Sequence, residues 1–225
     1  QDFANDNGDE DTEFKRAYVQ GKLGGLDVTA GRYSALFGNG NVFDANADGV
    51  ELSYGDNVKV TGFAGKATDG WVVGDTAGNY AGVEVAAGLG ENLTLTAGYV
   101  NFKDMGVKDS DIDNAFWTVG AEYTFGDFAL TGMYLKGDMS WGNVDSVADD
   151  DGFTVGLSYK GAEASEVGSY GLWANYYDQG GQTYVAHTTD ANTFDGMGFK
   201  GFGVGADYTF ATVSYTHLTL PTKLE

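Results

Sequence analysis

The sequence has no cysteine and a single proline among its 225 residues. Without cysteine, the chain can form neither a disulfide framework nor a thiolate metal site. With so little proline, long strands are allowed, because proline cannot donate the backbone hydrogen bond that a strand interior needs. No run of about 18 apolar residues occurs, which excludes a transmembrane helix but leaves open transmembrane strands of about 9–11 residues.

Positive charge is also scarce. Lys and Arg number 12 against 33 Asp and Glu, and the formal net charge is −21. This balance argues against a nucleic-acid partner, because phosphate binding needs clustered Lys and Arg. An acidic chain poor in aromatic residues would be disordered, but 14% of these residues are aromatic and 36 are Gly. We therefore expect an ordered protein with many tight turns.

Apolar residues alternate with polar or small ones along most of the chain. In the segment 115–125, one face carries Ala115, Trp117, Val119, Ala121, Tyr123 and Phe125. A period of two indicates a β-strand, because a helix repeats every 3.6 residues. The same alternation predicts about eleven strands. They are expected over 14–23, 25–33, 49–54, 58–65, 79–89, 93–102, 115–125, 128–136, 153–160, 169–177 and 200–210.

The connections between these strands alternate between short and long. The short turns are Gly24-Gly25, 55–57, 90–92, Gly126-Asp127 and 161–168, and the long loops are 34–48, 66–78, 103–114, 137–152 and 178–198. Gly126-Asp127 fits a two-residue hairpin turn of the primed type. Short turns at one end and long acidic loops at the other are typical of outer-membrane barrels. The sequence therefore predicts an all-β fold, an antiparallel up-and-down transmembrane β-barrel with a polar, water-filled interior.

Several aromatic residues lie beside the short turns. They are Tyr54, Tyr123, Phe125, Phe128, Tyr208 and Phe210. An amphipathic ring prefers the level of the lipid headgroups, so these positions suit an interfacial aromatic girdle. The alternative is a set of ordinary core aromatic residues near hairpin ends.

The stretch 14–54, FKRAYVQGKLGGLDVTAGRYSALFGNGNVFDANADGVELSY, resembles the general bacterial porins. The matching residues are Arg16-Ala17-Tyr18 and Gly31-Arg32-Tyr33. More narrowly, the Gly-rich and acidic style is similar to the S-layer-homology-linked porins of outer-membrane-bearing anaerobes. The resemblance implies location in the cell outer membrane and contact with its lipid. It also implies passive diffusion of small hydrophilic solutes and ions, a homotrimer, no cofactor and no catalysis.

The resemblance also bears on completeness. The family barrel has about sixteen strands, and bacterial barrels have even strand counts. About eleven strands over residues 1–211 would therefore be an incomplete barrel. Residues 212–225 break the alternation, contain the single proline and look like translated adapter sequence. We expect this tail to be non-native.

Charged residues on the inward faces are expected to line the pore or its constriction, because rings of charge set ion preference. The expected set is Arg16, Lys22, Arg32, Asp44, Asp48, Glu51, Lys59, Glu84, Glu122 and Lys160. The resemblance implies that the loop 34–48 folds into the barrel, with Arg16 and Arg32 on a wall opposite Asp44, Asp48 and Glu51. Strict alternation puts Arg32 on the lipid face. Either a β-bulge at Gly31 resets the register or Arg32 lies at the loop-side rim, and the bulge is the preferred interpretation. The acidic segment 44–51 lacks the ligand spacing of an EF-hand, and no metal site is predicted.

Other functions remain open at this point. The chain could be a structural or adhesive barrel that presents surface loops. A barrel enzyme would need a general base, and His187 is the one credible candidate. A soluble carbohydrate-binding sandwich could stack sugars on Trp71, Trp117, Trp141 and Trp173. A channel is the preferred hypothesis, with a mild preference for cations because of the acidic loops.

Overall fold

The computed structural model of the protein describes residues 15–68, 78–105, 112–141, 148–189, 197–211, 215–216 and 222–223. Its long strands each pair antiparallel with the next along the chain. They are β1 (Ala17–Leu23), β2 (Leu26–Phe37), β3 (Phe43–Tyr54), β4 (Val58–Ala67), β5 (Asn79–Leu89), β6 (Leu93–Lys103), β7 (Ile112–Phe125), β8 (Phe128–Trp141), β9 (Asp151–Lys160), β10 (Tyr170–Gly180) and β11 (Gly198–Tyr208). The expected all-β, up-and-down arrangement is confirmed.

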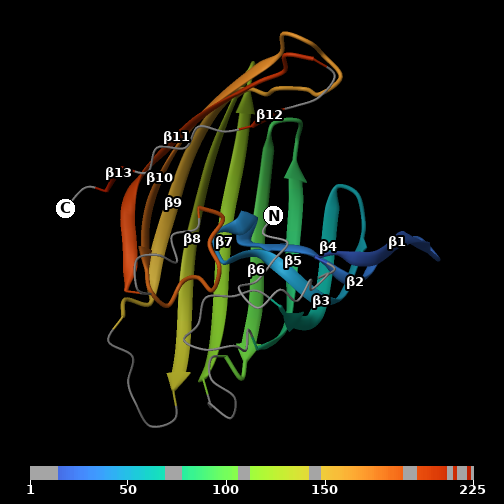
Figure 1. The fold of residues 1–225 in the computed structure, drawn as a ribbon, viewed down its shortest axis with the longest axis vertical. Coiled ribbons are helices and arrows are strands. Elements are labelled where there is room, and N and C mark those ends of the chain that lie inside the picture. Colours follow the sequence, from blue (N-terminus) through green and yellow to red (C-terminus); the bar gives the residue numbers. More distant parts are fainter. Residues whose placement is uncertain are drawn as a thin grey trace, which may run out of the picture.

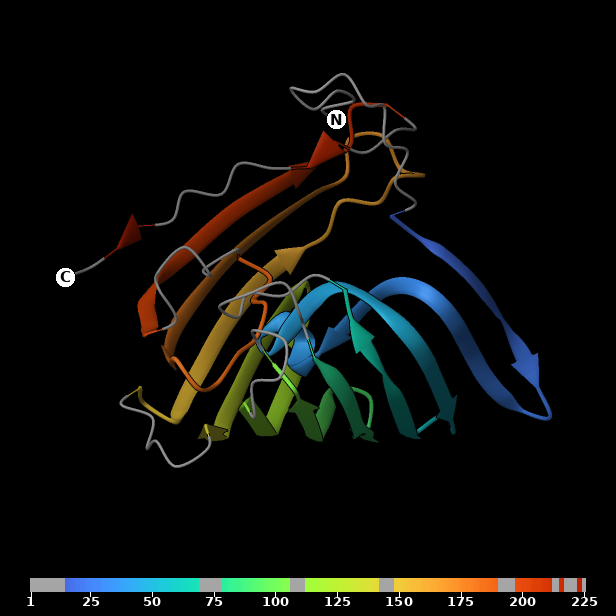
Figure 2. The same cartoon turned by 60° about the horizontal axis from the view of Figure 1, so that its bottom comes forward.

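The sheet is one curved layer with a concave and a convex side (Figures 1 and 2). Among the described residues, β1 and β11 do not pair with each other, so the sheet is open. A sandwich of two packed sheets is therefore wrong as an alternative, since every strand belongs to the same sheet. No helix in these ranges is long and apolar enough to cross a membrane.

The short turns lie where the sequence predicts them. Gly24 and Gly25 both have positive φ, 58° and 90°, which a primed two-residue turn accommodates. Gly126 has a φ of 59°, and its flanking residues Phe125 and Phe128 are paired in register. These turns depend on glycine and on pairing between neighbouring residues. Their positions can therefore be predicted from the sequence.

The expected long loop 34–48 is mostly strand. β2 continues to Phe37 and β3 begins at Phe43, so a single 3-10 turn, η1 (Gly38–Gly40), joins them. Beyond their pairing with β1 and β4, these two strands arch across the concave side of the sheet (Figure 2). The tip of this hairpin, residues 33–47, is called the inner hairpin below.

A row of glycines marks the place where the inner hairpin leaves the sheet. Gly31, Gly49 and Gly65 are paired in register across β2, β3 and β4. A Cβ on Gly49 or Gly65 would meet backbone atoms of the neighbouring strand and the hydroxyl of Tyr80. The absence of side chains in this row allows the strands to bend sharply and Tyr80 to rest on them.

The remaining long connections are only partly described. Residues 69–77, 106–111, 142–147 and 190–196 lie outside the described ranges, as do Trp71 and most of the tail. Within the tail, β12 (Tyr215–Thr216) and β13 (Thr222–Lys223) each pair with two residues of β11. That the tail is non-native, and that the whole barrel has about sixteen strands, remain predictions.

Candidate functional site: the concave face and the inner hairpin

The convex face of the sheet is apolar and exposed. Successive residues of a strand point to opposite faces, and paired residues share a face. One exposed apolar residue from each of β4 to β11 illustrates the convex side, with 41 to 63% of its surface accessible: Val60, Val83, Leu95, Val119, Leu130, Val155, Leu172 and Val204. Such a continuous apolar surface would be unfavourable in water.

Aromatic rings follow the short-turn end of this convex face. Ring centroids of Phe125 and Phe128 are 5.4 Å apart, and those of Phe128 and Tyr159 are 4.7 Å apart. Tyr159 in turn lies 6.2 Å from Tyr170, so the contacts cross from β7 to β10. All six aromatic residues of the expected girdle are exposed: Tyr54, Tyr123, Phe125, Phe128, Tyr208 and Phe210. The alternative of ordinary core aromatic residues is therefore wrong.

The concave face has two halves of different character. Near the short turns it carries threonine, asparagine and glycine, including the registered row Thr94, Glu122, Thr131, Gly156 and Asn175. Near the long loops it carries large apolar residues, including Phe63, Tyr80, Phe102 and Phe116, which are at most 5% exposed. The expectation of a polar interior therefore holds for only one half.

The inner hairpin packs on the apolar half. Phe37 lies at its tip, with a ring centroid 4.1 Å from that of Phe63 and 5.2 Å from that of Tyr80. Phe43, on the returning strand, lies 5.5 Å from Phe102. Phe37 and Phe43 are 1% and 0% exposed. Burial of aromatic rings at these distances supplies the main attraction that holds the hairpin against the wall.

Polar contacts then fix the position of the tip. The Gly38 amide donates to the Glu84 carboxylate at 2.9 Å. On the other side, Gln179 of β10 donates through Nε2 to the Asn41 carbonyl oxygen at 3.2 Å. A charged oxygen and a backbone amide make a strong hydrogen bond in a covered site. The tip therefore spans the concave face from β5 to β10.

The segment after β10 closes over the hairpin. The Val185 amide donates to the Val42 carbonyl oxygen at 2.8 Å, and the Asp44 amide donates to the Ala186 carbonyl oxygen at 2.8 Å. His187, 2% exposed, places Nε2 3.3 Å from Asn41 Oδ1. Burial lowers the pKa of this imidazole to about 3. A neutral ring enclosed in this way is a packing element, which does not support a general base at His187.

Half of the expected pore residues face the concave side. These are Lys22, Glu51, Lys59, Glu84 and Glu122. The register decides this, since Glu51 is paired with the inward-facing Phe63. Glu84 lies beneath the hairpin tip, whereas Glu122 lies on the polar half of the wall.

The expected β-bulge at Gly31 is wrong. Pairing is continuous through Gly31 in both ladders, so no extra residue is inserted. Arg32 keeps the face of Ala30 and is paired directly with Asp48. Their side chains form a two-point contact, Nε to Oδ1 at 2.7 Å and Nη2 to Oδ2 at 2.8 Å.

The expected separation of basic and acidic walls is also wrong. Arg32 and Asp48 lie on adjacent strands of one hairpin, and Glu51 points to the opposite face of β3 from Asp48. Because the inward residues of the hairpin pack on the wall, the face with Arg32 and Asp48 points away from that wall. The two side chains are 34 and 45% exposed.

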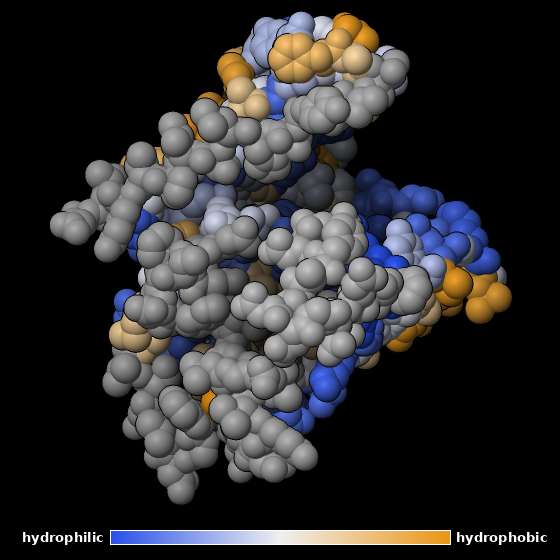
Figure 3. Space-filling model, in the orientation of Figure 1, coloured by the Kyte–Doolittle hydropathy of each residue, from blue (hydrophilic) through white to orange (hydrophobic). Residues whose placement is uncertain are grey.

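Three further expected residues lie at edges. Arg16 Nε is 3.5 Å from Asn46 Oδ1 at the outer strand of the sheet. Asp44 lies on the same face as Asp48, beside the 181–189 segment. Lys160 lies at the β9–β10 turn, with Nζ 5.4 and 5.2 Å from the ring centroids of the convex residues Tyr159 and Tyr170. Lys160 is thus at the rim rather than on the inner wall. Figure 3 shows hydrophilic residues over the arm formed by β1–β3, with hydrophobic ones at its tip.

A metal site finds no support in the described ranges, where no three His, Cys, Asp or Glu side chains gather closely enough to hold an ion. The alternation pattern did not predict that Asn41, Gln179 and His187 join the hairpin to β10 and to the segment after it. One available signal was the loss of alternation near the loops, where Tyr99-Val100 and Phe116-Trp117 place apolar residues on both faces. An apolar patch on an inward face indicates that something packs on it.

No protein-family model matches the sequence, and no curated protein matches it. Solved structures do match the fold. OmpT of Vibrio cholerae, expressed in the outer membrane, is 20% identical, with a TM-score of 0.58 over 88% of this chain and 66% of that chain. The anion-selective porin from Comamonas acidovorans is 17% identical, with a TM-score of 0.58 over 92% of this chain and 66% of that one.

The chain has a porin fold. A trimer form of in-vitro folded Vibrio cholerae OmpT, 21% identical, matches with a TM-score of 0.56 over 94% of this chain and 76% of that chain. The chain spans 66% of the length of two of these structures.

Proposed function

We propose that the protein is an outer-membrane porin, a water-filled channel for passive diffusion of small hydrophilic solutes and ions. The observation that carries this proposal is the division of one curved sheet into an exposed apolar convex face and a partly polar concave face. Lipid can cover such a convex face, and water can fill the concave one. The membrane interface would lie at the row of aromatic rings that crosses from β7 to β10 beside the short turns.

The inner hairpin is the proposed constriction. It crosses the concave side, and Arg32 and Asp48 lie at its base, on the face turned away from the wall. The wall adds Glu51, Glu84 and Glu122 against Lys22 and Lys59, an acidic excess in line with the net charge of −21. Fixed carboxylates near a narrow passage favour cations. We therefore infer a mild cation preference.

Further features follow from the same proposal. We infer a homotrimer, because one of the matching structures is described as a trimer form. The stretch 14–54 supports a place among the general bacterial porins, and the acidic, Gly-rich composition supports a place among the S-layer-homology-linked porins. The channel needs no cofactor and performs no catalysis, since diffusion makes and breaks no covalent bond.

Single-channel conductance in a planar lipid bilayer tests the proposal. The protein is refolded in detergent, its folding is checked by heat-dependent gel mobility, and currents are recorded across a salt gradient. Discrete open steps with a reversal potential that favours cations are expected. Folded protein without steps would overturn the channel and favour a barrel that anchors surface loops.

A further inference from the structure

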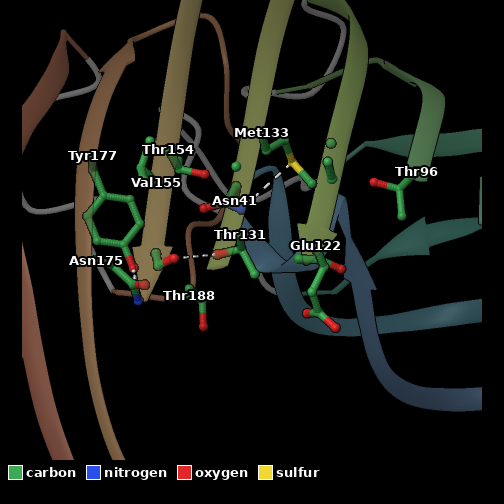
Figure 4. Close-up of a pocket in the computed structure, with 15 residues that line it drawn as sticks. Asn41, Thr96, Glu122, Thr131, Met133, Thr154, Val155, Asn175, Tyr177 and Thr188 are labelled. Carbon is green, nitrogen blue, oxygen red and sulfur yellow. Dashed lines mark hydrogen bonds between the residues drawn. The ribbon is translucent and has the colours of Figure 1, made fainter. Parts of the chain in front are cut away.

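A cavity lies between the tip of the inner hairpin and the polar half of the wall. Its volume is about 190 Å³, enough for several water molecules or a small solute. Asn39 and Asn41 contribute from the hairpin and Thr188 from the 181–189 segment. The wall side comes from β6 to β10 (Figure 4).

The lining is rich in uncharged polar side chains and holds one charge. Hydroxyl and amide groups come from Asn39, Asn41, Thr96, Thr131, Thr154, Asn175, Tyr177 and Thr188. Among the described residues of the lining, Glu122 is the single carboxylic acid, and none is Lys, Arg or His. Figure 4 shows Glu122 beside Thr131, with Asn175 and Tyr177 across the cavity.

Hydrogen bonds within the lining occupy several of its donors. The Asn175 amide group donates to the Tyr177 hydroxyl at 3.0 Å, and the Thr131 hydroxyl donates to the Gly156 carbonyl oxygen at 3.4 Å. The Asn41 amide group donates to the Gly38 carbonyl oxygen at 3.0 Å. Asn175 Oδ1 and the Glu122 carboxylate remain as acceptors, beside hydroxyl groups of Thr96, Thr154 and Thr188 that can donate or accept. Glu122 carries the one formal charge among the described lining residues, so a cationic hydrogen-bond donor suits the cavity best.

We propose that this cavity is a binding station for small organic ammonium solutes, which the Glu122 carboxylate and neighbouring amide and hydroxyl oxygens contact on their way through the pore. An ammonium group offers three N–H donors and a positive charge, and a charge-assisted hydrogen bond to a carboxylate is stronger than a neutral one. A small anion would be repelled by the Glu122 carboxylate, and no Lys, Arg or His among the described lining residues would balance that repulsion. The inference rests on the proposed channel function.

Two glycines keep the cavity open. A Cβ on Gly156 would meet Asn175 Oδ1 and Thr131 Oγ1, and a Cβ on Gly120 would lie 2.7 Å from Thr96 Oγ1. Gly156→Ala therefore fills the floor of the cavity without changing its charge. This substitution therefore tests whether binding needs the space of the cavity, independently of the charge on Glu122.

The test compares three probes of similar size: ethanolamine, ethylene glycol and glycolate. Binding to detergent-refolded protein is measured by calorimetry, and interruption of the ion current is measured in bilayers. Ethanolamine is expected to bind about tenfold more tightly than the other two, and Glu122→Gln to remove that preference. Glu91→Gln, in the β5–β6 turn, is the matched control and should change binding less than about twofold. Gly156→Ala should weaken ethanolamine binding while conductance persists.

The outcomes separate the two proposals. Equal binding of the three probes by wild-type protein overturns the ammonium site, whatever the variants do, and so does unchanged ethanolamine binding in Glu122→Gln. If open channels persist in either case, the proposed function stands. Selective ethanolamine binding by folded protein that never conducts would overturn the channel and support the site.

Discussion

The two halves of the concave face differ in what covers them. Near the short turns the inward residues are small or polar, as at Thr131 and Asn175, and they border a cavity. Near the loops the inward residues are large and apolar, as at Phe63 and Phe102, and the inner hairpin buries them. Both halves belong to the same strands, so strand formation does not explain the difference. An inward apolar patch identifies the place where the chain folds back on itself.

The largest expected effect comes from the tip of the hairpin. Phe37→Ala removes a ring that is 1% exposed and stacked on Phe63, and it should lower the free energy of unfolding by about 3–5 kcal/mol. The control, Phe125→Ala, removes a ring that is 43% exposed near the short turns. Urea unfolding in detergent, followed by tryptophan fluorescence, measures both. Equal losses would mean that the hairpin adds little to stability.

Acid should lower the stability of the protein through His187, which packs against the tip of the inner hairpin. The pKa of His187 is lowered to about 3 by burial, so below pH 6.5 the unfolded chain binds a proton that the folded chain does not. Stability should fall from about pH 6.5 toward pH 3, by about 2–3 kcal/mol between pH 6.5 and 4.5. His187→Asn should remove this part of the pH dependence, while carboxylates titrate alike in both proteins. The same slope in both would contradict a buried neutral ring.

The glycine row offers a matched pair within one strand. A Cβ at Gly65 would meet the Asp48 carbonyl oxygen, the Gly49 Cα and the Tyr80 hydroxyl, whereas a Cβ at Gly62 would meet nothing within 4 Å. Gly65→Ala should cost about 1–3 kcal/mol through overpacking, and Gly62→Ala should be nearly neutral. Urea unfolding midpoints compare the two. If Gly62→Ala were the more harmful, the bend would not depend on close strand approach.

The smallest effect is expected at the exposed ion pairs. Arg32 and Asp48 make a two-point contact at the bend, whereas Lys22 and Asp27 are 77 and 53% exposed at the β1–β2 turn. A double-mutant cycle with Arg32→Met and Asp48→Asn should give a coupling of at most about 1 kcal/mol, and the Lys22–Asp27 cycle a smaller one. High salt should reduce both. A larger coupling at the turn would reverse this ranking.

The all-β, up-and-down fold was predicted correctly from the sequence, because it depends on the period of two. The same period predicts which side of the sheet a charge occupies, whereas the role of these charges in a pore stays a prediction. Glu51, Lys59 and Glu122 follow directly from alternation. Alternation could not place Arg32 opposite Asp48, because the partner of a residue depends on the length of the loop between the strands. The loop was expected over 34–48, and its true extent, 38–42, gives a different pairing.

Strand order, turn positions and the identity of the convex face were determined by the sequence itself. Turn glycines and alternating residues act on neighbours in the chain, so they need no distant partner. The path of the inner hairpin was decided only by the tertiary structure. It depends on contacts such as Gln179 to Asn41 and His187 to Asn41, which join residues 138 and 146 positions apart. Such contacts form only after the sheet has curved and brought β10 opposite β3.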